Sequence, residues 1–305
     1  MANEWQIEAV SAEILTRATA VPLQVEAVSA DVLVKAINVP LQVESVSVEV
    51  LTSAQPSGTY INTVLADAPL AWWRMNDAAG WSLTADQSGK ARHGTNVGSF
   101  GSTASTITDS STALTDAANA YSYITSPSWA TGLGDFTVEG WFKTTAGGNQ
   151  AIITMDDINQ SPGAVGRKFA LYLGGGQMTF MCFTNAGGYP YIQSPLTTYN
   201  DGQWHHVMAT RSGVVMTLFM EGAQVATTTQ TGVTWTGSNV DLLLGGIRWT
   251  NTGASGNSYL FNGTLDELSI YGTALSSTRV NAHYTAGAPT AAPATPSFTG
   301  WGRPI

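Results

Sequence analysis

The chain has 305 residues, of which 11% are charged, and its 21 acidic residues outweigh its 12 basic ones to give a net charge of −9. Nucleic-acid binding depends on clustered Lys and Arg that neutralise phosphates, so this balance argues against a nucleic-acid partner. The low charged share and the 32 glycines favour a β-rich chain with many turns over a helical one.

The sequence also argues against disulfides and membrane spans. Cys182 is the single cysteine, so no intrachain disulfide or cysteine zinc cluster can form, and its apolar neighbours predict a buried side chain. The first residues lack the basic flank and apolar core of a signal peptide, and no run approaches about 18 apolar residues. We therefore expect a soluble protein that is made in the cytoplasm and does not insert into membranes.

Residues 1–56 contain a three-fold internal repeat. The copies begin at Trp5, Leu23 and Leu41, 18 residues apart, and share the pattern Gln-Val-Glu-Ala-Val-Ser-Ala-Asp-Val-Leu with small changes. Apolar and polar residues alternate within each copy, which is typical of a strand with one apolar face. The repeats are therefore predicted to form three short strands.

Three such strands bury too little apolar surface to offset the chain entropy lost on ordering about 50 residues. We therefore expect the repeats to need a partner surface. They could close symmetrically with identical segments, with a trimer preferred, or add to the sheet edge of another protein. A meander packed on the chain's own sandwich is a third interpretation. The side chains predicted to meet in an assembly are Val10, Val28, Val32 and Val46.

Two further segments are predicted to lie outside a packed domain. Residues 57–69 are expected to be a linker, because Pro56 and Gly58 lie in a polar stretch. Residues 288–305 are rich in Ala and Pro and too poor in apolar bulk to pack, so an extended tail is expected. Its terminal Trp301 either anchors the chain on a partner or is incidental.

Residues 70–287 contain many short β-like runs separated by Gly, Asn and Asp turns, the spacing expected of a sandwich. Glycines at 174–176 and at Gly222 predict tight hairpin turns, and Ser276 is the expected N-cap of a helix. The clearest strands are expected at residues 136–143, 169–173, 177–183, 204–210, 214–220 and 241–244.

Several of these strings resemble, in order and spacing, the motifs of the concanavalin A-like, laminin-G-like family. Residues 136–143 resemble its F-T-V-E-x-W-x-K strand, residues 202–207 its G-x-W-H-H-V strand, and residues 261–276 its closing F-x-G-x-I-D-E-V-x-I-Y strand. Residues 70–94 resemble its opening strand and D-x-S-G turn, and residues 220–225 replace its hairpin. The resemblance implies an all-β, two-sheet antiparallel jelly-roll sandwich, a fold that hosts glycan, protein and calcium binding as well as purely structural roles.

The 18-residue repeats and the terminal Gly-Trp-Gly-Arg-Pro-Ile resemble the ends of tailed-bacteriophage virion proteins. This resemblance implies a structural protein at the virion surface, a fibre or decoration appendage of head or tail that is attached to other virion proteins. We predict that it displays a lectin-like domain that adheres to surface glycans. The alternatives are a structural capsid or tail module without a ligand, and a cellular carbohydrate-binding module, which the missing signal peptide disfavours.

Calcium is the cofactor that the laminin-G-like resemblance suggests, because such sandwiches hold the ion near the first and last strands. Asp77, Asp86 and Asp266 occupy those positions and supply the oxygen ligands that calcium prefers. Asp86 and Asp266 could instead cap turns by accepting hydrogen bonds from nearby backbone amides.

Aromatic residues in loops are the candidates for glycan binding, since a flat ring stacks on the apolar face of a pyranose. Tyr189, Tyr191 and Trp249 lie in Gly- and Asn-rich sequence and are the predicted residues. Their alternative role is to anchor loops on the sheet.

An enzyme is not expected. His205 and His206 are adjacent, so on a strand they point to opposite faces and cannot hold one metal together. No Ser-His-Asp or Cys-His arrangement has a motif context, and the acidic pair Asp156 and Asp157 has no recognisable carboxylate partner.

Overall fold

The computed structural model describes residues 57–289, except for residues 106, 108–109, 115–118, 126, 158–167, 184–187, 196–197, 231–239 and 248–258. Contacts divide the chain into two compact units, Met1–Leu51 and Thr52–Ile305, and all described residues belong to the second. The predicted repeat strands with Val10, Val28, Val32 and Val46, and also Trp249 and Trp301, lie outside the described residues.

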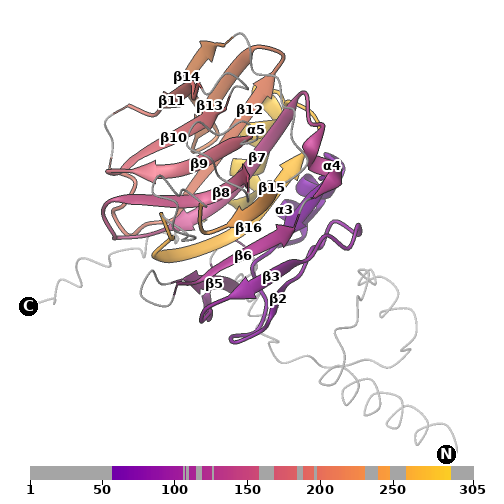
Figure 1. The fold of residues 1–305 in the computed structure, drawn as a ribbon, viewed down its shortest axis with the longest axis vertical. Helices are drawn as coiled ribbons and strands as arrows, with labels where there is room; N and C mark the ends of the chain where they lie inside the picture. The colour runs from indigo at the N-terminus through magenta and orange to yellow at the C-terminus, as the bar shows by residue number, and fades with distance from the viewer. Residues whose placement is uncertain are drawn as a thin grey trace, which may run out of the picture. The chain divides into compact units, whose positions relative to one another are not determined.

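Two antiparallel sheets of eight strands each stack into a sandwich, which confirms the predicted jelly-roll class (Figure 1). Sheet A has the order β14 (Ala223–Thr229), β13 (Val215–Met220), β12 (His205–Ser212), β7 (Phe136–Lys143), β16 (Gly263–Tyr271), β5 (Ser110–Leu114) and β4 (Gly101–Ala104), with β1 (Ala71–Trp73) also paired to β16. Sheet B has the order β11 (Tyr191–Gln193), β10 (Gln177–Cys182), β9 (Phe169–Gly174), β8 (Asn149–Asp157), β15 (Val240–Leu244), β6 (Tyr121–Thr125), β3 (Gly94–Val97) and β2 (Leu83–Thr84).

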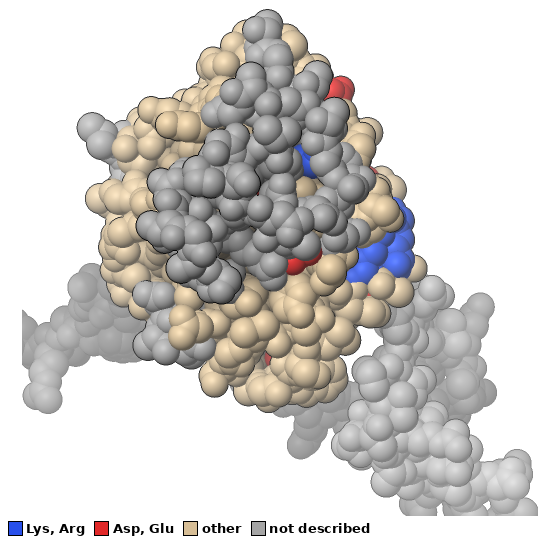
Figure 2. Space-filling model, viewed as in Figure 1, with Lys and Arg blue, Asp and Glu red and all other residues tan. Residues whose placement is uncertain are grey.

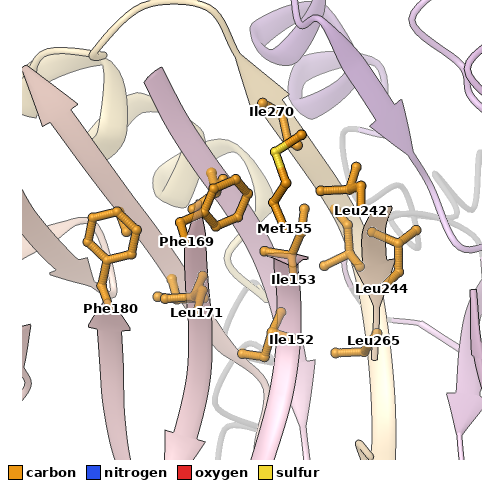
Figure 3. Close-up of a cluster of buried hydrophobic side chains, with 14 of the residues drawn as sticks. Ile152, Ile153, Met155, Phe169, Leu171, Phe180, Leu242, Leu244, Leu265 and Ile270 are labelled. Atoms are coloured by element: carbon orange, nitrogen blue, oxygen red, sulfur yellow. The ribbon is translucent and has the colours of Figure 1, made fainter. Parts of the chain in front are cut away.

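The main core lies between the two sheets, where alternate residues of each strand point inward. Figure 3 shows this packing, with Phe169, Phe180 and Leu242 among the side chains that meet there. A bulge between Ala151 and Ile153 breaks the alternation in β8, so Ile152 and Ile153 both join this core. The predicted buried position of Cys182 is confirmed in the same cluster.

The predicted hairpin turns are confirmed. Gly175 and Gly176 connect β9 to β10 with φ values of 58° and 89°, a backbone region that glycine enters without steric cost. Gly222 (φ 74°) turns the chain between β13 and β14, and a Cβ there would lie 2.8 Å from the side chain of Tyr284. The turn therefore needs glycine both for its φ and for the close approach of Tyr284.

Three helices complete the described fold: α3 (Ser57–Ala66), α4 (Ser128–Thr131) and α5 (Ser277–Gly287). Ser276 caps α5 as predicted, with its Oγ accepting a hydrogen bond from the backbone N–H of Arg279. No helix of the described part of the chain is both long and apolar enough to cross a membrane.

The prediction of a linker at residues 57–69 is wrong, because α3 is packed into the domain. Tyr60 and Val64, which are one helical turn apart, are fully buried in a cluster with Trp72, Trp141 and Ala286 on the outer face of sheet A. Pro56 precedes α3 and Gly58 lies in its first turn, so both are compatible with the helix although they favour a loop locally. Burial of Tyr60 and Val64 outweighs this local preference. Helices α3 and α5 also contact each other.

Candidate binding face

A single line of cross-strand partners runs across all eight strands of sheet B. From β2 to β11 its members are Leu83, Thr95, Tyr123, Leu243, Thr154, Ala170, Met181 and Tyr191. Directly paired residues point to the same side of a sheet, whereas their neighbours along each strand point to the other. Because neighbours such as Leu242 and Phe180 lie in the main core, this line marks the outer face of sheet B.

The middle of this outer face is covered. Ile247 packs with Ala170 and Met181, while Leu260 packs with Tyr121 and Leu243. The hydroxyl of Thr154 donates a hydrogen bond of 2.8 Å to the carbonyl of Gly246, which holds the backbone next to Ile247 in place. The face is therefore accessible at its two ends, where Leu83 and Tyr191 are exposed, rather than along its whole length.

The β11 end carries four tyrosines, Tyr172, Tyr189, Tyr191 and Tyr259, which we call the tyrosine patch. Tyr189 and Tyr191 are 58% and 53% exposed, which is high for side chains with large apolar rings. The rings of Tyr172 and Tyr259 are half-buried, with their centroids 5.8 Å apart. Gly188 and Tyr189 precede the edge strand that contains Tyr191.

Polar side chains are interleaved with these rings. Gln193 is exposed on β11, and its Nε2 donates a hydrogen bond of 3.1 Å to Oγ1 of Thr179. Burial raises the pKa of Tyr172, a hydrogen bond with Thr179 lowers it, and the nearby hydroxyls of Tyr259 and Tyr191 raise it again. The patch thus offers flat apolar rings together with amide and hydroxyl groups.

The predicted glycan-binding residues are therefore only partly described. Tyr189 and Tyr191 are exposed, as such a role requires, and Trp249 lies outside the described residues. Glycan binding by these three side chains stays a prediction. Sequence reasoning missed Tyr172 and Tyr259 because only the fold places the second beside the first.

The largest titratable cluster in the described residues lies on the opposite side of the sandwich, beneath α3 and α5. At its centre is Glu139 of β7, which is fully buried. Its two carboxylate oxygens accept hydrogen bonds of 2.7–3.1 Å from side chains of four other elements: Tyr60, His206, Ser269, Tyr271 and His283.

This cluster extends to Asp67, just after α3. Nε2 of His283 lies 2.7 Å from Oδ2 of Asp67, and the guanidinium of Arg279 contacts the same carboxylate. Burial alone would raise the pKa of Glu139, but the charge of His283 and the hydrogen bonds from both histidines lower it well below its usual range. Burial lowers the pKa of His283, yet Glu139 and Asp67 raise it overall. These groups clamp both helices onto sheet A, and Glu139, His206 and His283 are fully buried, so they are closed to a substrate.

A family model of the concanavalin A-like lectin/glucanases superfamily matches residues 116–281, just over half of the chain. The chain belongs to this superfamily. The match covers the strands that contribute Glu139 and His206, and most of sheet B. No curated protein matches the chain.

Solved structures share the superfamily fold at low sequence identity. The receptor binding domain of botulinum neurotoxin mosaic serotype C/D has a TM-score of 0.53 at 14% identity, over 72% of this chain and 51% of that one. The botulinum neurotoxin DC binding domain in complex with rat synaptotagmin II has a TM-score of 0.53 at 12% identity, over 73% and 52%. The binding domain of Paraclostridial Mosquitocidal Protein 1 has a TM-score of 0.51 at 15% identity, over 69% and 52%. The chain thus spans about half the length of these domains, and the likeness shows the fold alone.

The D-x-S-G turn of this superfamily member is held together by Asp86. Its carboxylate accepts hydrogen bonds from the backbone N–H groups of Trp72, Ser88 and Arg92 and from the hydroxyl of Ser88. Burial would raise the pKa of Asp86, and these hydrogen bonds lower it overall. Asp86 therefore makes the backbone contacts that its alternative role as a turn cap predicts.

The other two predicted calcium ligands also contact the chain itself. Asp77 accepts hydrogen bonds from the backbone N–H of Ala85, and Asp266 accepts one from the hydroxyl of Ser105. Within the part of the chain that the structure describes, no group of three or more His, Cys, Asp or Glu side chains could hold a metal ion. Calcium binding by Asp77, Asp86 and Asp266 stays a prediction.

The acidic pair at residues 156–157 has a carboxylate neighbour that the sequence did not reveal. Asp156 of β8 is the cross-strand partner of Asp241 of β15, so the two side chains share the outer face of sheet B. Both are nearly fully buried, with exposures of 1% and 2%.

His205 and His206 have different environments, as predicted for adjacent strand residues. His206 is fully buried against Glu139, whereas His205, whose side chain is 13% exposed, lies between Asp201 and Glu221. Burial lowers the pKa of His205, but hydrogen bonds to Glu221 and Asp201 raise it overall. Trp204 is partly buried and packs against the cluster that contains Tyr60 and Trp141.

Proposed function

We propose that residues 57–289 form a binding module that adheres to glycans through the tyrosine patch. The observation that carries this proposal is the exposure of Tyr189 and Tyr191 beside the Tyr172–Tyr259 pair, at an open end of sheet B. Such rings stack on the apolar face of a pyranose, while Gln193 and the tyrosine hydroxyls hydrogen-bond its hydroxyls. The similar fold of one domain described as receptor binding and of another described as a binding domain supports a binding role.

The module is proposed to have no enzymatic activity. Glycoside hydrolysis needs two carboxylates that flank an accessible bond. Asp156 and Asp241 face each other but are buried, and the Glu139 cluster is enclosed by helices. The described surface seen in Figure 2 is mostly uncharged, which suits a neutral ligand such as a saccharide.

The wider context proposed is the surface of a tailed-bacteriophage virion, where residues 1–56 attach the module. The three-fold repeat and the Trp301 peptide support this role, because both resemble segments of such virion proteins. A homo-oligomer, with a trimer preferred, would bury the repeated valine stripe. The module would then be displayed in several copies, with other virion proteins as its attachment partners.

The glycan proposal is tested by applying fragment 57–289 to a glycan array and measuring hits by calorimetry. Tyr191→Ala should weaken binding by about tenfold or more, as expected for a ring that stacks on the ligand. Val214→Ala is the matched control, since Val214 is 44% exposed but lies in the β12–β13 turn of sheet A. If the fragment binds no glycan, the module is a structural decoration without a saccharide ligand.

Assembly is tested separately by light scattering on the full chain. We expect an oligomer that becomes monomeric when residues 1–56 are removed, or when Val28 and Val32 are changed to Asp, since unpaired carboxylates cannot stay in a dry seam. A monomeric full-length chain would rule out self-association and leave docking on another protein.

A further inference from the structure

Trp81 is the most exposed tryptophan among the described residues. Its side chain is 54% exposed, whereas Trp72, Trp73 and Trp141 are buried to within 2%. Sequence reasoning did not select it, because the sequence around a single tryptophan does not show whether its ring is exposed. An exposed indole excludes a packing role for most of its ring.

The backbone around Trp81 is fixed in place. Its N–H donates to the carbonyl of Ala78 (3.3 Å), and its own carbonyl accepts a hydrogen bond of 2.9 Å from Nδ2 of Asn96. The N–H of Asn96 in turn donates to Ser82 (2.9 Å), and Gly80 makes the preceding turn with φ 80°. The indole is thus presented by a pinned turn, which reduces the entropy lost when a ligand binds.

Trp81 lies at the β2 edge of sheet B. It precedes β2 by two residues, and the pairing of β2 with β3 extends toward it through the hydrogen bond from the N–H of Asn96 to the carbonyl of Ser82. Leu83, the first residue of β2, is 37% exposed. Leu83 pairs with Thr95, which pairs with Tyr123 on β6. This end, which we call the tryptophan end, therefore lies at the edge of sheet B opposite to the β11 edge with the tyrosine patch, beyond the covered middle.

The size of the tryptophan end favours a saccharide over a protein. A specific protein interface buries about 800 Å² on each partner, whereas one indole and part of a leucine offer on the order of 200 Å². The neighbouring exposed side chains, Ser82 and Thr95, carry hydroxyls and no charge. A flat ring among neutral polar groups matches a neutral sugar.

We infer that the tryptophan end is a second glycan-binding site, which makes one module bivalent for a long polysaccharide. The inference rests on the proposed function of the tyrosine patch. The two ends are seven strand spacings apart, roughly 34 Å at about 4.8 Å per spacing. A polymer that occupies both gains avidity of about 100-fold or more over either end alone, whereas a short oligosaccharide reaches only one.

The test uses fragment 57–289 with soluble β-glucan, mannan and galactan polymers and with their short oligosaccharides, in affinity electrophoresis and calorimetry. Trp81→Ala and Tyr191→Ala each keep one end, so each should weaken polymer binding by about 100-fold, to the level of the short oligosaccharide. The double variant should not bind the polymer. Trp81→Phe keeps an aromatic ring and should retain part of the affinity, and Val214→Ala should behave like the parent. Thermal unfolding confirms that each variant is folded.

The outcomes separate the two proposals. If Tyr191→Ala weakens binding and Trp81→Ala does not, the second site is wrong and the tyrosine patch stands. If the parent binds none of these saccharides, both proposals fail for this class of glycan. If Trp81→Ala instead dissociates a dimer of the fragment in light scattering, the tryptophan end is a protein contact and the inference is overturned.

Discussion

Nε2 of His283 lies 2.7 Å from a carboxylate oxygen of Asp67, so a buried histidine of α5 is tied to the residue that follows α3. Its other ring nitrogen, Nδ1, lies 3.0 Å from Glu139 in the centre of sheet A. A protonated imidazole can donate to both carboxylates at once, whereas a neutral one can donate to only one.

This relationship predicts how stability depends on pH. His283 has a pKa raised above 6.5, so its stabilising contribution is complete below that value and is lost as the pH rises through the folded pKa. Glu139 has a pKa lowered from 4.5, so its contribution is present above that value and is lost as the pH falls through the folded pKa. The melting temperature should therefore peak between about 4.5 and 6.5.

His283→Gln should flatten the alkaline decline in calorimetric melting curves. His205→Gln is the comparison variant: His205 also has a raised pKa, but its partners Asp201 and Glu221 are partly exposed, so this variant should flatten the decline less. An unchanged alkaline slope in His283→Gln would show that another group causes the decline.

Glu139→Gln should destabilise the fold by about 3–5 kcal/mol, since it removes the fully buried carboxylate of the two that balance the charge of His283. Urea unfolding of fragment 57–289 measures this free energy. Glu221→Gln, which removes a partly exposed partner of His205, should cost about 1 kcal/mol or less. A similar decrease in the free energy of unfolding of both variants would show that Glu139 stabilises the fold no more than a surface carboxylate does.

Helix α3 should be essential to the sandwich. A fragment beginning at residue 57 should fold as a monomer, whereas one beginning at residue 70 loses Tyr60, Val64 and Asp67. Burial of Tyr60 and Val64 contributes about 1.5–3 kcal/mol each. Denaturant titration of the two fragments measures the difference, and equal stability would show that α3 only rests on the surface.

Asp86→Ala should destabilise the fold by about 1–3 kcal/mol, because the backbone donors it satisfies lose their acceptor. Melting with calcium and with chelator separates the two roles of this carboxylate. Calcium at about 100 times its dissociation constant would add roughly 2.7 kcal/mol if Asp77, Asp86 and Asp266 bind it. An equal melting temperature with calcium and with chelator would show that Asp86 caps the turn and does not bind calcium.

The elements that sequence reasoning recovered depend on short-range signals. The hairpin at Gly175 and Gly176 follows from a φ that only glycine enters easily, and the start of α5 follows from a serine that caps it. The opposite environments of His205 and His206 follow from the two-residue period of a strand.

The features that were missed depend on contacts between distant residues. Pro56 and Gly58 read as a linker because the partners of Tyr60, among them Trp141 and Glu139, lie about 80 residues further on. Asp156 and Asp241 lie opposite each other because β15 pairs with β8, and the sequence does not indicate this pairing. The exposure of Trp81 depends on β2 lying at an edge, which composition does not indicate.

The clamp between the helices and sheet A has a mechanical consequence. Helix α3 receives the chain from the N-terminal repeats and α5 passes it toward the C-terminal tail. Tension applied at residue 57 is passed through Asp67 and His283 to Glu139 on β7, which is paired on both sides by β12 and β16. A pull at residue 57 is therefore carried by the side-chain contacts at the centre of sheet A and, along the chain, by β1, which pairs with β16, rather than by the edge strands β14 and β4.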